Sequence, residues 1–120
     1  MAQLLIVDDE LDVREFAHNF FKKRKIDCIS AESGEEALKI ISQGKPKLVL
    51  LDIRMSGISG IETLKKIKEI DRAIDVVMVT GVDEEDGFRE AQELGASGYI
   101  HKPLRLDELE EAVLSRLGKK

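Results

Sequence analysis

Hydrophobic and polar residues follow one another in blocks along the chain, and these blocks predict alternating strands and helices. Four short apolar runs occur at Leu4–Val7, Leu48–Leu51, Val76–Val79 and Gly98–His101. Runs of this length with few polar residues are typical of parallel strands that are buried on both faces. A further short strand is expected at about residues 27–30.

Each of the four runs leads into polar residues that can carry chemistry. These residues are Asp8 and Asp9, Asp52, Thr80, and Lys102 with Pro103. The carboxyl ends of parallel strands lie at one edge of a sheet, where open α/β proteins bind their ligands. The three aspartates therefore converge if the first and third strands are neighbours.

Between the strands, apolar residues recur at helical spacing. Helices are predicted near residues 12–24, from the capping box Ser33–Glu36 onward, around Ile61–Ile67, near 84–94 and near 106–117. The side chains expected to face the core are Val13, Phe16, Ala17 and Phe20, then Ala37, Leu38 and Ile41, then Ile61, Leu64 and Ile67, and finally Leu106, Leu109, Val113 and Leu117. Gly87 weakens the fourth helix by about 1 kcal/mol relative to alanine, and Gly95 is expected to end it in a left-handed conformation.

Five strand–helix units with short connections predict an α/β fold, with a doubly wound parallel sheet covered by helices on both faces. Residues 1–120 suffice for a single domain, and no long linker or repeat divides them.

The net charge of −5 argues against a nucleic-acid binder. We expect a cytoplasmic protein without membrane contact, because Cys28 is the one cysteine and no apolar run approaches membrane-spanning length.

Carboxylates that are close together repel one another unless one is protonated or a cation offsets their charge. Oxygen donors of this kind suit Mg²⁺ or Mn²⁺, and a bound cation attracts phosphate. Lys102 and Thr80 could surround a transferring phosphoryl group, where catalysis consists mainly of positioning and charge stabilisation. One carboxylate would then be the nucleophile that forms an acyl phosphate. Asp52 is the better candidate because it stands alone, whereas Asp8 and Asp9 form a pair.

Four motifs, in order along the chain, carry a resemblance to a known family. They are Val7–Glu10, Leu51–Gly57 followed by Gly60, Val79–Gly81, and Gly95–Pro103. With these motifs the chain resembles, over essentially its whole length, the receiver domain of bacterial two-component response regulators. The resemblance implies one receiver domain over residues 1–120, with a flavodoxin-like (βα)5 fold and the strand order 2-1-3-4-5.

The resemblance also implies how the site works. Asp52 would accept a phosphoryl group from the phosphohistidine of a sensor histidine kinase or a histidine phosphotransfer protein. Asp9, Asp52 and the backbone carbonyl of Arg54 would bind Mg²⁺ directly, and Asp8 would act mostly through water. Thr80 and Lys102 would contact the phosphoryl group.

The resemblance further implies a switch. The Lys102–Pro103 peptide would be cis, and Tyr99 would swing inward when Thr80 moves. The surface of the fourth helix, fifth strand and fifth helix would then change for a downstream protein, a tethered output domain or a phosphorylation-dependent homodimer. Such a module catalyses only its own phosphorylation and dephosphorylation, so it is not a metabolic enzyme, and it makes no direct contact with nucleic acid.

Two residues depart from the usual pattern of the family. Ser56 stands where proline is common and should loosen the turn without removing the chemistry. Gly81 replaces the usual alanine after the switch threonine, which keeps the backbone N–H accessible but makes the loop more flexible.

Two alternative functions remain open. The first is a pseudo-receiver that binds a partner without phosphate, which the intact Asp52, Thr80 and Lys102 disfavour. The second is a phosphatase of the haloacid-dehalogenase type, which is expected to carry Asp-x-Asp-x-Thr after its first strand. Arg54 stands where the second aspartate of that motif belongs. Glycine-rich nucleotide-binding motifs are absent from the sequence.

Overall fold

The computed structural model describes residues 3–54, 57–80 and 85–117, with only the backbone of 85–88. Five strands alternate with five helices over these residues. The strands are β1 (Leu4–Val7), β2 (Cys28–Ala31), β3 (Leu48–Asp52), β4 (Asp75–Thr80) and β5 (Gly98–His101). The helices are α1 (Leu11–Lys22), α2 (Gly34–Gln43), α3 (Gly60–Ile70), α4 (Glu85–Glu93) and α5 (Leu106–Arg116). Ser56 and Gly81, the two departures noted in the sequence, lie outside the described residues.

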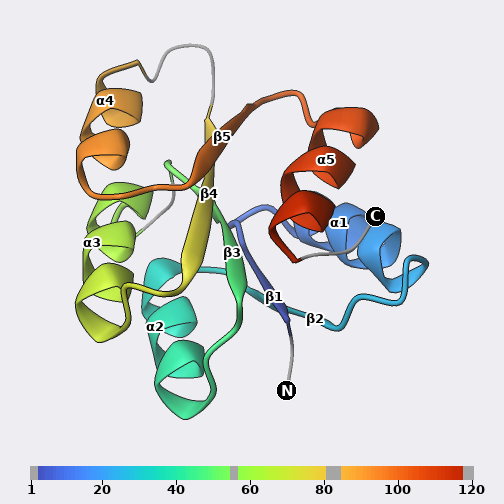
Figure 1. Cartoon of the computed structure of the whole chain (residues 1–120), viewed down its shortest axis with the longest axis horizontal. Coiled ribbons are helices and arrows are strands. Elements are labelled where there is room, and N and C mark those ends of the chain that lie inside the picture. Colours follow the sequence, from blue (N-terminus) through green and yellow to red (C-terminus); the bar gives the residue numbers. More distant parts are fainter. Residues whose placement is uncertain (1–2, 55–56, 81–84, 118–120) are drawn as a thin grey trace.

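All five strands are parallel and form one sheet in the order β2-β1-β3-β4-β5. Helices α1 and α5 cover one face, and α2, α3 and α4 cover the other (Figure 1). The predicted doubly wound fold and its strand order are therefore confirmed. The order places β1, β3 and β4 side by side, so their carboxyl ends share one edge of the sheet.

The apolar runs are explained by two separate cores, one on each face of the sheet. Successive side chains of a strand point to opposite faces. In β1, Leu5 and Val7 belong to the core under α2 and α3, whereas Leu4 and Ile6 belong to the core under α1 and α5. Because helices cover both faces, every position of β1 and β3 and residues 76–80 of β4 are buried, and the sequence shows unbroken apolar runs there instead of alternation. In β5, the strand at the edge of the sheet, only Ile100 is fully buried.

Two residues predicted to face the core, Phe16 and Leu106, are exposed. Phe16 is 43% exposed, and its place in the core is taken by Phe21, which was absent from the predicted stripe and is fully buried. The inward stripe of α1 is centred on Ala17, Phe20 and Phe21, so Phe16 lies on its flank and stacks against Phe20 with ring centroids 6.4 Å apart. Leu106 is 51% exposed because it is the first residue of α5, one turn before the part of the helix that packs on the sheet.

Local hydrogen bonds explain where the helices begin and end. Ser33 caps α2 by accepting a hydrogen bond from the Glu36 N–H, as predicted, but the Glu36 carboxylate accepts from the Glu32 N–H rather than from Ser33. Helix α1 ends at Lys22, earlier than predicted, because Lys25 has a φ of 62° and turns the chain into a Schellman-type end. Gly95 has a φ of 97° after α4, which confirms the predicted left-handed end.

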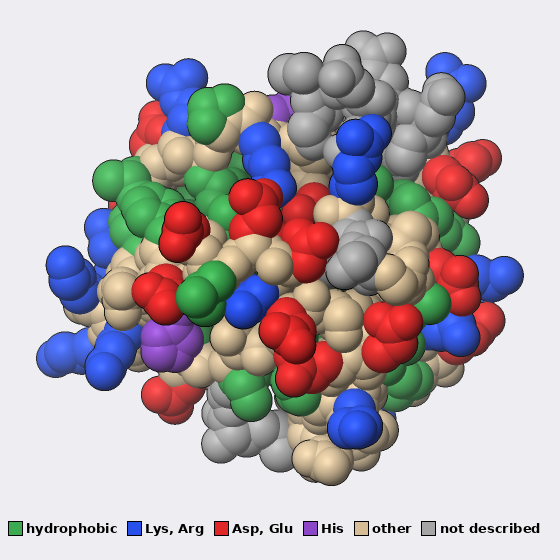
Figure 2. Space-filling model, turned by 180° about the vertical axis from the view of Figure 1, so that it is seen from behind, with side chains coloured by type: hydrophobic (Ala, Val, Ile, Leu, Met, Phe, Trp, Pro, Cys, Tyr) green, Lys and Arg blue, Asp and Glu red, His purple; other side chains and the backbone are tan. Residues whose placement is uncertain are grey.

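No helix among the described residues is long and apolar enough to span a bilayer. On the face behind the view of Figure 1, basic and acidic side chains are interspersed (Figure 2).

Candidate functional site

The strand order brings the polar residues at the strand ends to one place. Asp8 directly follows β1, Asp52 ends β3, Thr80 ends β4 and Lys102 directly follows β5. Asp8 is 2% exposed and Asp52 is 3% exposed, so both carboxyl groups lie at the bottom of the site. The structure thus assembles the side chains that the sequence analysis singled out at the ends of four different strands.

The Lys102 side chain lies among three carboxylates. Its Nζ is 3.0 Å from Asp52 Oδ2, 3.4 Å from Glu10 Oε1 and 3.7 Å from Asp8 Oδ2. The backbone N–H of Lys102 donates to the Thr80 carbonyl at 2.7 Å, which fixes the residue beside the end of β4. The Lys102–Pro103 peptide bond is cis.

Burial sets the electrostatics of the site. It raises the pKa of Asp8 to about 6, and the nearby Asp52 charge adds to this effect, while the Glu10 N–H and Lys102 oppose it. Burial also raises the pKa of Asp52, although the hydrogen bond and charge of Lys102 oppose the shift. Burial by itself lowers the pKa of Lys102, but the surrounding carboxylates outweigh it and raise the value. Burial, more than repulsion between the carboxylates, therefore disfavours their charged forms, and a further cation close to them would favour ionisation.

Backbone amides hold both buried carboxylates in place. Asp8 Oδ1 accepts a hydrogen bond from the Glu10 N–H at 2.9 Å. Asp52 Oδ1 accepts one from the Arg54 N–H at 3.2 Å. In addition, Arg14 Nη1 donates to the Asp8 carbonyl at 2.8 Å and ties α1 to the end of β1. Each carboxylate thus keeps an oxygen that faces Lys102.

The donor set of the site fits a hard divalent cation. Carboxylate oxygens of Asp8, Asp9 and Glu10 lie within 4.8 Å of one another, and Asp8 and Asp52 both face Lys102 Nζ, at 3.7 and 3.0 Å. Oxygen donors of this type suit Mg²⁺, which needs only a few protein ligands. Glu10 was not among the predicted ligands, although it stands third in the acidic run after β1 and the sequence could have indicated it.

Thr80 and Tyr99, the two predicted switch residues, are both shielded. Thr80 is 1% exposed, and its Oγ1 has no hydrogen-bond partner among the described residues. A buried hydroxyl without a hydrogen bond destabilises the folded protein, and a new hydrogen bond to an incoming acceptor oxygen would remove this cost. The Tyr99 ring packs against the core under α2 and α3, and burial raises the pKa of its hydroxyl.

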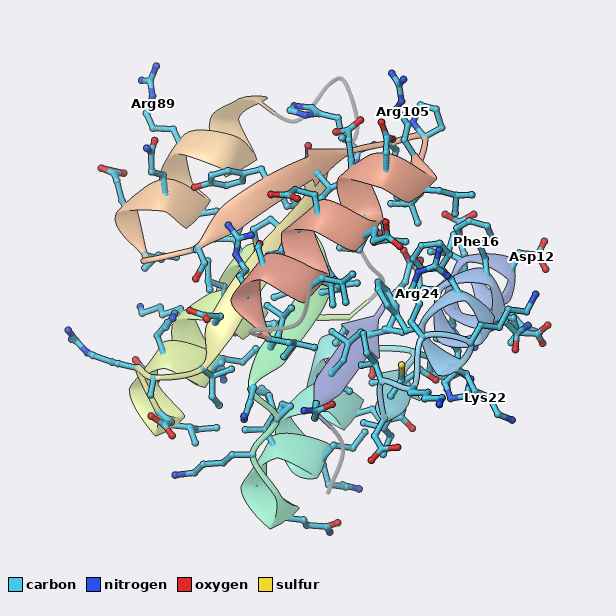
Figure 3. All side chains as sticks on the ribbon, turned by 45° about the vertical axis from the view of Figure 1, so that its right-hand side comes forward. Asp12, Phe16, Lys22, Arg24, Arg89 and Arg105 are labelled. Carbon is cyan, nitrogen blue, oxygen red and sulfur yellow. The ribbon has the colours of Figure 1, made fainter. Side chains whose placement is uncertain are left out.

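An open groove adjoins the site. Its volume is about 410 Å³, and its lining combines polar and apolar side chains. The lining residues are Glu10, Asp12, Val13, Phe16, Lys102, Pro103 and Leu104. Asp12 and Phe16 lie on the outer side of α1 (Figure 3). Lys102 therefore faces both the buried aspartates and this groove.

Several known proteins are similar to this chain in sequence and in fold. The family model of the response regulator receiver domain matches residues 4–114. Sporulation initiation phosphotransferase F of Bacillus subtilis is 40% identical over 92% of this chain and 90% of its own length. The chemotaxis protein CheY of Halobacterium salinarum is 32% identical over 92% of both chains. The receiver domain of NtrX from Brucella abortus superposes with a TM-score of 0.90 at 29% identity, covering 98% of this chain and 99% of that domain.

The fold and the acidic strand-end site define a signalling domain of two-component systems. The chain belongs to the response regulator receiver domain family, which confirms the resemblance seen in the sequence. Receiver domains act as phosphorylation switches rather than conventional enzymes, bind Mg²⁺ at an acidic pocket, and interact with histidine kinases and output domains. Other relatives are longer, and the phosphate regulon transcriptional regulatory protein PhoB of Pseudomonas aeruginosa is matched over 52% of its length.

Proposed function

We propose that residues 1–120 form one receiver domain in the cytoplasm, and that Asp52 is its phosphoryl acceptor. The observation that carries this proposal is the 3.0 Å contact between Lys102 Nζ and a buried Asp52 carboxylate at the carboxyl edge of the sheet. A lone aspartate that only capped a turn would not need a cation from another strand end. The nucleophile and a group that neutralises charge are thus held together before the substrate arrives.

The proposed reaction is a phosphoryl transfer from a phosphohistidine. A carboxylate oxygen of Asp52 forms a bond to phosphorus while the phosphorus–nitrogen bond breaks, and the leaving imidazole keeps the electron pair. Lys102 stays within reach of the new acyl phosphate and offsets its charge. The Thr80 hydroxyl, which lacks a partner among the described residues, donates to a phosphoryl oxygen. Hydrolysis of the acyl phosphate later restores Asp52, so the domain turns over only its own phosphate.

The acidic side chains would hold the cation that this chemistry needs. Asp9, Asp52 and the carbonyl of Arg54 are the proposed direct ligands, Asp8 would act mostly through water, and the position of Glu10 adds it as a neighbour of the site. When bound, Mg²⁺ supplies charge stabilisation for the phosphoryl oxygens. Burial raises the pKa of Asp8, and a second positive charge beside Lys102 would favour the ionised form of this carboxyl group.

The groove beside Lys102 is the proposed entrance for the phosphoryl donor. The exposed ring of Phe16, with Val13, Pro103 and Leu104, offers an apolar surface next to the site. A sensor histidine kinase or a histidine phosphotransfer protein has to bring its histidine within bonding distance of a nearly buried carboxylate. An apolar contact area at the rim would hold such a partner long enough for transfer.

The proposed output follows from the displacement of Thr80 and Lys102 toward the phosphoryl group. Both residues flank the β4–β5 pair, since Thr80 pairs with His101 in the sheet register. Movement there would reposition Tyr99 and the surface formed by α4, β5 and α5. A downstream protein, a tethered output domain or a second phosphorylated copy would read that surface.

The decisive experiment is to measure phosphate uptake by intact mass after incubation with acetyl phosphate and Mg²⁺. The wild type should gain one phosphoryl group that hydroxylamine removes, as expected for an acyl phosphate. Asp52→Asn should gain none and should keep the fold. Asp27→Asn is the matched control, because Asp27 is exposed at the opposite edge of the sheet, before β2.

The same experiment separates the alternatives. Equal phosphate uptake by Asp52→Asn would reject the assigned acceptor. A wild type that binds Mg²⁺ but takes no phosphate from acetyl phosphate or a phosphorylated kinase would favour the pseudo-receiver. Release of phosphate from many small phosphate esters would favour the phosphatase. Tyr99 fluorescence can report on the switch, because the chain holds one tyrosine and no tryptophan.

A further inference from the structure

The first turn of α2 lies against the loop that follows Asp52. Gly34, the first residue of α2, is buried. A Cβ on Gly34 would come within 2.7 Å of Ile58 Cγ1 and would also collide with Thr63 Oγ1 of α3. The absence of a side chain at this position therefore allows α2 to approach both the loop and the first turn of α3.

Glu35, the next residue, extends this contact with its carboxylate. Glu35 Oε2 accepts a hydrogen bond from the Ile58 N–H at 3.3 Å. Its two oxygens also lie 2.8 and 2.9 Å from the place that a Cβ on Gly57 would occupy. Gly57 has a φ of 80°, a conformation that favours glycine. The Glu35 carboxylate thus fills the space that a side chain on this turn would take.

The same loop is anchored at its base beside Asp52. The Gly60 N–H donates to the Ile53 carbonyl at 2.8 Å and closes the loop where α3 begins. Arg54, inside the loop, donates its N–H to Asp52 Oδ1 and carries the carbonyl that we assign to the cation. A shift of residues 57 and 58 would reach Gly60 and, through its hydrogen bond, Ile53 and the neighbouring Asp52.

We propose that Glu35 is a positioning residue for phosphoryl transfer. Glu35 fixes the loop after β3, and this loop in turn carries Arg54 and orients the Asp52 carboxylate. This inference rests on the proposed function. It assigns a role to a residue that touches neither the phosphoryl group nor the cation.

The test compares Glu35→Ala and Glu35→Gln with the wild type. Three quantities are measured: the rate of phosphorylation by acetyl phosphate, the Kd for Mg²⁺ alone from Tyr99 fluorescence or calorimetry, and hydrogen exchange of the Ile58 amide. Glu35→Ala should speed exchange at Ile58, weaken Mg²⁺ binding and slow phosphorylation by about 5- to 10-fold, because small misplacements of reacting groups are costly. Glu35→Gln should recover most of the rate, because its amide oxygen can still accept from the Ile58 N–H.

Glu69→Ala serves as the control, since Glu69 is an exposed glutamate near the far end of α3. A Glu35→Ala variant with wild-type rate and Mg²⁺ affinity would overturn the proposal, even if its Tm falls. Equal losses in Glu35→Gln and Glu35→Ala would also overturn it, because they would show that the charge of Glu35 acts rather than its hydrogen bond. A wild type that takes no phosphate at Asp52 would instead refute the proposed function and this inference with it. The wild-type measurement therefore tells the two failures apart.

Discussion

Lys102 Nζ lies 3.0 Å from Asp52 Oδ2, although 50 positions separate the two residues in the chain. Asp52 ends β3 and Lys102 follows β5, two strands that are not neighbours in the sheet. The long lysine side chain crosses the end of β4 and places its charge next to two buried carboxylates. The free energy of unfolding should therefore depend on the charges of Lys102, Asp8 and Asp52.

Lys102→Met should lower the free energy of unfolding by about 1–2 kcal/mol at about pH 8 without Mg²⁺. The substitution keeps the side-chain length but leaves Asp8 and Asp52 charged and without their cation. The loss should shrink toward pH 5, because Asp8, whose pKa is raised to about 6, takes up a proton there and no longer needs the cation. Urea unfolding at the two pH values measures the difference.

The control for this prediction is Lys66→Met. Lys66 pairs with Glu62 at 3.8 Å on the exposed surface of α3, so its loss should change stability by less than about 0.5 kcal/mol. An equal loss for Lys102→Met at both pH values would contradict the electrostatic explanation.

Asp8→Asn should stabilise the protein at neutral pH in the absence of divalent cations. The folded protein holds the pKa of Asp8 at about 6, above the ordinary 3.8, so the folded state binds this proton more tightly than the unfolded state. The stability contributed by protonated Asp8 is therefore fully present below the unfolded pKa of 3.8 and is lost as the pH rises through about 6. Relative to the wild type, the variant should gain about 1–3 kcal/mol near pH 7.5 and almost nothing near about pH 3.

Thermal or urea unfolding in EDTA measures this difference across the pH range. Added Mg²⁺ should then stabilise the wild type more than Asp8→Asn, because the variant has lost one acidic group of the proposed cation site. A variant that is less stable than the wild type at neutral pH would show that the Asp8 charge is already fully compensated by Lys102.

Cys28 should react slowly with thiol reagents in the folded protein. Burial raises its pKa from 9.0 to about 11, and the neighbouring Asp27 charge contributes. At neutral pH this shift lowers the thiolate fraction by roughly 100-fold relative to an ordinary cysteine. The rate with a disulfide reagent, compared with the rate in urea, measures the protection. Similar rates in both conditions would mean that β2 opens readily.

Gly60→Ala should destabilise the protein by about 2–3 kcal/mol, because overpacking at rigid backbone is costly. A Cβ there would collide with the Asp52 carbonyl and would come within 2.6 Å of Ile53 Cα. Asp52 itself must move, so phosphate uptake should also fall. The comparison is Gly95→Ala, where the positive φ costs about 1 kcal/mol but the nearest atom, Lys68 Cε, is 3.8 Å away. That variant should keep normal phosphate uptake, and equal uptake by both would contradict the prediction.

The sequence by itself determined the class of fold. Buried parallel strands leave unbroken apolar runs, and the amphipathic helices between them have a period that local geometry imposes, so both signals are local. The same reasoning found Asp8, Asp52, Thr80 and Lys102, because each follows an apolar run directly. It also found the capping serine of α2 and the left-handed Gly95, since both depend on a few adjacent residues.

Only the tertiary structure decided how these groups meet. The sheet order, which the sequence suggested through resemblance alone, sets the 3.0 Å contact of Lys102 with Asp52 and brings Glu10 into the same cluster. The exposure of Phe16 and Leu106 could not be predicted from apolar character, because it depends on where α1 and α5 leave the sheet. The contact of Glu35 with the loop after Asp52 joins residues 23 positions apart. Contacts of this kind depend on the packing of whole elements, which no local pattern in the chain records.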